Sequence, residues 1–163
     1  MTNSQYFNLD IEMDKYHTLI DMEMLVNILQ TGKLPFTLDL LKTHLPGVLK
    51  TKCFNENNLC FEEEVKNTEI AHLFEHILLE NLYQIKIREG FRNVMYRGDT
   101  SWNWKKDKRG IFHIYLSCSQ ADKNYFEEAL NKTISLINLI LDSYFYYPEF
   151  QSKPVYETVA LSQ

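Results

Sequence analysis

The sequence contains few of the residues that cross-link or interrupt a chain. Among 163 residues there are three cysteines, five glycines and four prolines. No region is rich in proline, glycine or serine and there is no internal repeat, which favours a chain without a flexible linker. Residues 1–9 show no basic segment followed by an apolar one, so we expect no signal peptide. An odd cysteine count without an export signal predicts reduced thiols and a cytoplasmic location.

Long apolar runs and an excess of positive charge are absent as well. No stretch approaches 18 uninterrupted apolar residues, so we expect no membrane span. The formal net charge is −5, which argues against sequence-independent binding of nucleic acid, because that needs a cationic surface. One local basic run comprises Lys105, Lys106, Lys108 and Arg109. Such a run is usually a solvated turn.

The composition that remains is that of a globular protein. Apolar residues make up 45% of the chain and aromatic residues 13%, including ten tyrosines and ten phenylalanines. A chain of this length is large enough to bury a proper core. We therefore expect one module over residues 1–163, with a core at about 15–143 and a tail at 144–163 that packs partly and then frays.

Two long helices are predicted from the spacing of apolar residues. The first covers about residues 68–86, with Thr68 as the expected N-cap and no proline to interrupt it. Its apolar stripe consists of Ile70, Leu73, Phe74, Ile77, Leu78, Leu82 and Ile85. The second covers about residues 122–143 and buries Phe126, Ala129, Leu130, Ile134, Leu136, Ile137 and Ile140.

The remaining segments predict a small sheet and a shorter helix. Strands are expected at residues 16–20, near 59–61, and at 91–96 and 111–118, the last two as a hairpin around the polar segment 97–110. A helix is expected from residue 36 until Pro46-Gly47 stops it, and residues 22–31 fit either a short helix or a loop. The fold class is α+β, with two layers: a small antiparallel sheet packed against two long helices.

A metal-binding motif lies within the first long helix. The residues His72-Leu73-Phe74-Glu75-His76 have the order H-x-x-E-H. Histidines four apart lie one above the other on a helix face, so both imidazoles can reach one metal ion. This is the arrangement of the inverse zincins, in which the glutamate takes a proton from the water to be activated. The alternative is a helix with two partly buried histidines and a solvated glutamate.

The segments around this motif resemble the N-terminal domain of cyanophycin synthetase. In that family a hydrophobic strand containing aspartate precedes a helix that ends in Leu-Pro-Gly, a cysteine, and an H-x-x-E-H-x-x-x-E-L helix. The matching segments here are 18–21, 40–41, 45–47, Cys53, 67–68 and 72–82. The family then has a G-x-T segment, a strand and an A-x-x-x-A-x-x-L-I helix, which correspond to residues 97–100, 111–116 and 129–137. The resemblance covers roughly residues 15–141.

The resemblance implies a hydrolase-like module. In the family this domain precedes an ATP-grasp ligase and a Mur-ligase-like part, and neither lies within these 163 residues, so we expect no ATP-dependent polymerisation. In some members the module resembles pitrilysin-type inverse zincins and can cut the peptide polymer. His72 and His76 would then bind zinc and Glu75 would be the general base. The expected function is zinc-dependent hydrolysis of a peptide or cyanophycin-like polymer.

Three departures from the family pattern favour an alternative function. Thr51 stands where the family usually has histidine, and residues 117–120 read Ser-Cys-Ser-Gln where an acidic group is common. Residues 55–58 replace a glycine-rich stretch. If a lost residue is a ligand or a substrate anchor, the protein is a non-catalytic binding or interaction module that retains the fold. Whether the chain is an enzyme is therefore left open.

A catalytic zinc usually has three protein ligands, so a third ligand is needed. Glu80 matches the family glutamate, but it lies about 12 Å along the helix from His72, so a role in orienting His76 is the alternative. Carboxylates from elsewhere could serve instead, and the candidates are Glu127, Glu128 and Glu157. Cys53 and Cys60 lack a close C-x-x-C spacing, so both are expected to be structural thiols and not zinc ligands.

Substrate contacts are expected from the segment after the motif helix. Arg97, Trp102 and Trp104 could form a rim that binds a peptide or polyamide polymer, through pairing with carboxylate and packing on aliphatic stems. The alternative is that tryptophan pins the loop to the core. The lone histidines, His17, His44 and His113, are expected to be structural or exposed. Tyr144–Tyr147 fit a core or dimer contact, and self-association is left open.

Overall fold

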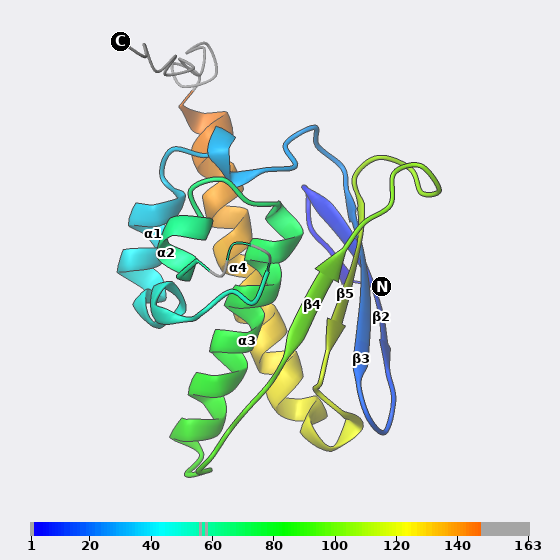
Figure 1. Ribbon diagram of the computed structural model, residues 1–163, viewed down its shortest axis with the longest axis vertical. Helices are drawn as coiled ribbons and strands as arrows, with labels where there is room; N and C mark the ends of the chain where they lie inside the picture. The colour runs from blue at the N-terminus through cyan, green and yellow to red at the C-terminus, as the bar shows by residue number, and fades with distance from the viewer. Residues whose placement is uncertain (1, 56, 58, 148–163) are drawn as a thin grey trace.

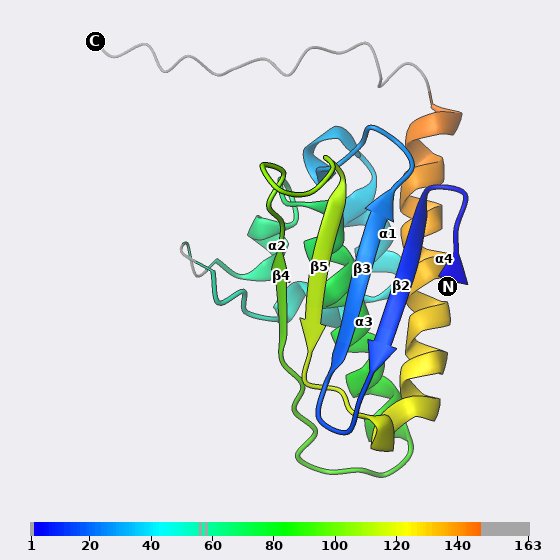
Figure 2. The same ribbon diagram turned by 90° about the vertical axis from the view of Figure 1, so that its right-hand side faces the viewer.

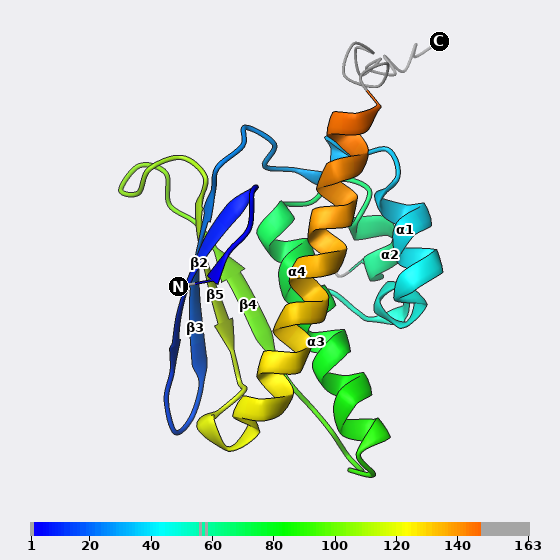
Figure 3. The same cartoon turned by 180° about the vertical axis from the view of Figure 1, so that it is seen from behind.

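The computed structural model describes residues 2–55, 57 and 59–147, which form an α+β fold of two layers. A five-stranded antiparallel sheet makes one layer, and two long helices pack against one of its faces (Figures 1 and 3). This arrangement confirms the predicted fold class. No helix within the described ranges is long and apolar enough to cross a membrane.

The sheet is assembled from both ends of the chain. Its strands are β1 (Thr2–Asn3), β2 (Phe7–Met13), β3 (Thr18–Met24), β4 (Gly98–Ser101) and β5 (Ile111–Leu116). They are ordered β1-β2-β3-β5-β4, and every neighbouring pair is antiparallel. The strand β4 therefore lies at an edge of the sheet (Figure 2).

One face of the sheet is buried because its strands alternate in hydrophobicity. The fully enclosed side chains on this face are Phe7, Leu9, Ile20, Met22, Phe112, Ile114 and Leu116. Polar residues, such as Asp10 and Asp21, alternate with them and face solvent. Phe7 and Leu9 precede the predicted start of the core at about residue 15, so the core begins earlier than expected.

The two long helices confirm the predictions made from apolar spacing. Helix α3 (Ile70–Arg88) is continuous, and α4 (Lys123–Tyr146) extends beyond its predicted end at residue 143. They pack against each other and enclose a row of aliphatic side chains between themselves and the sheet. The prediction that Thr68 is the N-cap was wrong. Glu69 holds that position, without a side-chain cap.

Short helices cover the N-terminal half of α3 on the side away from the sheet (Figure 1). They are η1 (Thr31–Lys33), α1 (Thr37–His44), η2 (Pro46–Lys50) and α2 (Phe61–Glu64). A further short helix, η3 (Gln120–Asp122), directly precedes α4. Pro46 ends α1 as predicted, because proline cannot continue the helical hydrogen bonding. The chain then turns through η2 and passes over α3, which places residues 51–55 beside the motif helix.

Several strand predictions were wrong for local reasons. Residues 91–96 form no strand, and the edge strand Gly98–Ser101 lies instead within the segment predicted as a loop. The predicted strand near 59–61 is a single bridge between Lys52 and Cys60, followed by α2. The segment 22–31 begins as the end of β3 and reaches η1 only at Thr31. The strand β2 was not predicted. Glu157 lies outside the described residues.

Candidate metal centre and cleft

A cleft of about 910 Å³ runs along α3 and contains the H-x-x-E-H motif. Helix α3 forms its floor, residues 51–55 form one wall, and the segment 94–100 with Trp102 forms the other. His72, Glu75 and His76 all line it. Both histidines therefore share one face of α3, as their spacing predicts, and that face borders the cleft.

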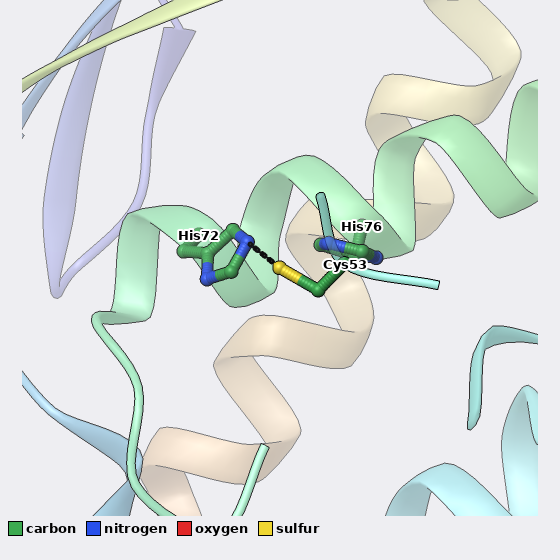
Figure 4. Close-up of side chains that lie close together, drawn as sticks. All are labelled: Cys53, His72 and His76. Atoms are coloured by element: carbon green, nitrogen blue, oxygen red, sulfur yellow. Dashed lines mark hydrogen bonds between the residues drawn. The ribbon is translucent and has the colours of Figure 1, made fainter. Parts of the chain in front are cut away.

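Cys53 joins the two histidines in a cluster of three potential metal ligands. Figure 4 shows the imidazoles of His72 and His76 projecting from successive turns of α3, with the thiol of Cys53 beside them. One donor atom from each residue lies within 4.8 Å of the other two. The Cys53 Sγ is 3.3 Å from His72 Nε2. The helix supplies two donors at i and i+4, and the segment after η2 supplies the third.

Two threonine hydroxyls orient the imidazole rings. Thr51 Oγ1 donates its hydrogen to the carbonyl of Val48 at 2.7 Å. The same oxygen lies 3.1 Å from His76 Nδ1, so it must accept a hydrogen bond from that nitrogen. The hydrogen of neutral His76 is therefore on Nδ1, and the lone pair is on Nε2. His72 Nδ1 lies 2.7 Å from Thr68 Oγ1, so this hydroxyl also holds its ring in place. Partners on the second ring nitrogen are what fixes the tautomer and orientation of histidines that bind metal.

Burial keeps all three potential ligands uncharged in the absence of metal. Desolvation lowers the pKa of His72, and it lowers the pKa of His76 to about 3, with the neighbouring His72 adding to the effect. Desolvation raises the pKa of the Cys53 thiol, and the charges of Glu64 and Glu75 contribute. Both imidazoles therefore carry the free lone pair that metal binding requires, and only the thiol must lose a proton.

The cluster suits zinc by donor type, and one of its spacings matches a zinc site. Zinc takes thiolate and imidazole ligands at about 2.3 and 2.0–2.1 Å in a tetrahedron, which places sulfur and nitrogen about 3.5 Å apart. The separation of 3.3 Å between Cys53 Sγ and His72 Nε2 is close to that value. Three protein ligands that line a cleft also leave a fourth position for water or substrate, as catalytic zinc sites do.

Glu75 lies beside this cluster and against the edge strand β4. It is only 5% exposed, and its Oε2 accepts a hydrogen bond of 2.5 Å from the hydroxyl of Thr100. A Cβ on Gly98 would lie 2.5 Å from Oε1, so glycine leaves the space that the carboxyl occupies. Burial raises the pKa of Glu75 to about 7, although the Thr100 hydrogen bond opposes the shift. A carboxyl with that pKa exchanges protons readily near neutral pH.

The glutamates predicted as a third ligand do not join the cluster. Glu80 lines the cleft, but its carboxylate accepts from Gln84 at 2.8 Å and lies against Gly47. Glu127 faces solvent near Lys123, and Glu128 is held by Arg88 and Lys132 on the outer surface of α4. Glu80 lies eight residues along the helix from His72, and its carboxylate is not part of the cluster of Cys53, His72 and His76.

The three residues predicted to bind substrate divide into two groups. Arg97 and Trp102 line the cleft, and the Trp102 side chain is 39% exposed. Trp104 does not line it: its indole N–H donates to the carbonyl of Ile111 at 3.0 Å, and its ring packs on Phe112. Trp104 therefore pins the β4–β5 loop to the core, which is the alternative considered for these tryptophans.

Cys53 is the site residue that reasoning from the sequence did not assign. It was expected to be a structural thiol, because Cys60 gives no close C-x-x-C pair with it. One signal was present: the family pattern that the chain resembles has a cysteine between the Leu-Pro-Gly turn and the motif helix. Cys60 is exposed and takes no part in the cluster.

No protein-family model matches the chain, and no curated protein matches its sequence.

Proposed function

We propose that the protein is a zinc-dependent hydrolase that cuts an amide bond in a peptide or a cyanophycin-like polyamide. The observation that carries the proposal is the convergence of Cys53, His72 and His76 in a cleft that also holds Glu75. The donor set suits zinc, and the glutamate has the proton affinity of a general base. The resemblance to the N-terminal domain of cyanophycin synthetase supports a polyamide as the substrate class.

The residues would divide the work as follows. Cys53, His72 and His76 would hold zinc, and the metal would supply Lewis-acid chemistry when bound. Glu75 takes a proton from the attacking water and returns it to the leaving amine, because a pKa of about 7 permits both transfers near neutral pH. Thr100 holds the carboxyl of Glu75 by its hydrogen bond and fixes which oxygen is free to act.

The test is hydrolysis that depends on both the metal and Glu75. Protein purified without a histidine tag is loaded with zinc and incubated with a peptide library and with an Asp/Arg polymer. We expect cleavage that disappears in the Glu75→Gln variant and after chelation. Glu127→Gln is the matched control, because this exposed glutamate lies on α4 outside the cleft. Absence of cleavage in the zinc-loaded wild-type protein would contradict the proposal.

A second candidate is a binding module that retains the cleft without catalysis. One observation favours it: the Glu75 carboxyl is almost fully enclosed and already engaged by Thr100, so it must be reached by substrate before it can act. In that case the polymer would bind along the cleft, near Arg97 and Trp102, and remain intact. Saturable binding of the Asp/Arg polymer by zinc-loaded protein without any cleavage would select this candidate.

A further inference from the structure

Phe61 packs against both imidazoles of the cluster of Cys53, His72 and His76. Its ring stacks on that of His76, with the ring centroids 3.9 Å apart and the planes only 11° from parallel. It meets the ring of His72 nearly at a right angle, at 84°, with the centroids 5.9 Å apart. The Phe61 side chain is fully buried and has no atom that can bind metal. Any effect that it has on a bound ion must therefore act through these two histidines.

Backbone pairing fixes Phe61 beside the other residues of the site. Its N–H donates to the carbonyl of Thr51 at 2.9 Å, and the N–H of Cys53 donates to the carbonyl of Leu59 at 3.2 Å. The hydroxyl of Thr51 is also the group that accepts from His76 Nδ1. The two paired segments therefore supply the thiol of the cluster, the hydroxyl at the edge of the His76 ring and the phenyl ring on its face.

These contacts hold the His76 ring in two directions. The hydrogen bond to Thr51 restrains the edge of the ring at Nδ1, and Phe61 covers one face and blocks rotation of the ring out of its plane. The lone pair on Nε2 therefore keeps one direction. A metal-bound imidazole shares the positive charge of the ion, and the face of an aromatic ring is negative, so the stacked contact strengthens when metal binds.

We propose that Phe61 is a positioning residue of the metal centre: by stacking on His76 it fixes the plane of that ligand and raises the affinity of the cluster for zinc. The proposal rests on the metal binding that the proposed function requires, and not on hydrolysis. Phe61 lies in α2, outside the H-x-x-E-H motif, so the motif alone does not specify this contact. The packing of α2 against α3 creates it.

Phe7 provides a matched control for the role of Phe61. It is also fully buried, and its ring makes an edge contact with Phe74, with centroids 6.0 Å apart, in the core between the sheet and α3. It does not line the cleft. Exchange of either phenylalanine for leucine removes the same atoms from a fully enclosed position, so both variants should lose comparable stability. Only the loss of Phe61 should reach the metal centre.

The experiment titrates the full chain with zinc in competition with a chromogenic chelator, after thermal unfolding has confirmed that each variant folds. We expect Phe61→Leu to weaken zinc binding by about tenfold or more, as loss of a group that orients a metal ligand does. Phe7→Leu should stay within about twofold of the wild-type affinity, because distant sites act independently. Equal zinc affinity in Phe61→Leu and wild type, or an equal loss in both variants, would overturn the proposal.

A second measurement uses metal-free wild-type protein, so it does not depend on the folding of a variant. NMR should place the ring protons of His76 upfield of those of the exposed His44, because the ring current of Phe61 acts on a group stacked at 3.9 Å. Ring protons of His76 at the positions of His44 would overturn the proposal. Zinc binding without hydrolysis would contradict the proposed function and leave the role of Phe61 intact, whereas a chain that binds no zinc would overturn both.

Discussion

Replacing Glu75 with glutamine should stabilise the protein, and increasingly so as the pH rises. Burial raises the pKa of this carboxyl from 4.5 to about 7. Between these values the folded state retains a proton that the unfolded state releases, so raising the pH favours unfolding. Since one pKa unit is worth about 1.4 kcal/mol, ionised Glu75 destabilises the fold by roughly 3 kcal/mol once the pH exceeds both values. Glutamine removes this cost and still accepts from Thr100.

The assay is urea unfolding of metal-free wild-type and Glu75→Gln proteins, each at pH 5 and pH 8. The two should have similar stability at pH 5, where Glu75 is mostly protonated in the folded state. By pH 8 the variant should be more stable by roughly 2–3 kcal/mol. Both proteins contain His72 and His76, so the lowered pKa values of those histidines largely cancel in the difference. A stability difference that does not change with pH would refute the assigned environment of Glu75.

Three further outcomes follow from the site. Thr51→Val removes the acceptor for the N–H of His76 and should weaken zinc binding by about 10- to 100-fold. A competition titration measures this, and an unchanged zinc affinity would exclude the orienting role of Thr51. Zinc binding near neutral pH should release about one proton, from Cys53, because the lowered pKa values of both histidines leave them without a proton to release. Calorimetry in buffers of different ionisation enthalpy counts the released protons. A count of zero would exclude the thiol as a ligand. Trp104→Phe should cost about 1 kcal/mol of stability by loss of the bond to Ile111 and leave zinc affinity unchanged, as unfolding and titration would show.

The helices could be predicted from the sequence because their apolar residues recur at helical spacing over several turns. This spacing also placed His72, Glu75 and His76 toward one cleft, since residues three and four apart on a helix are neighbours. The strand β4 could not be predicted in this way. Its residues Gly98–Ser101 are mostly polar, because an edge strand needs no regular apolar alternation, and pairing with β5 defines it.

Cys53 shows why the complete metal centre did not follow from local patterns. A ligand supplied by the same helix would have a readable spacing, but Cys53 reaches the histidines only because η2 turns the chain back over α3. The glutamates expected as ligands illustrate the converse. Glu80 has the sequence position of a family residue, yet its carboxylate accepts from Gln84 and is not part of the cluster.

We expect Cys53, His72 and His76 to bind one metal ion together. The most direct test replaces zinc with cobalt in protein purified without a histidine tag and records the absorption spectrum. We expect one cobalt ion per chain and a visible absorption band typical of tetrahedral cobalt. We also expect a thiolate charge-transfer band in the near ultraviolet that Cys53→Ser abolishes. The exposed Cys60, changed to serine, should leave the spectrum intact. No stoichiometric binding, or a spectrum indifferent to Cys53, would contradict the account.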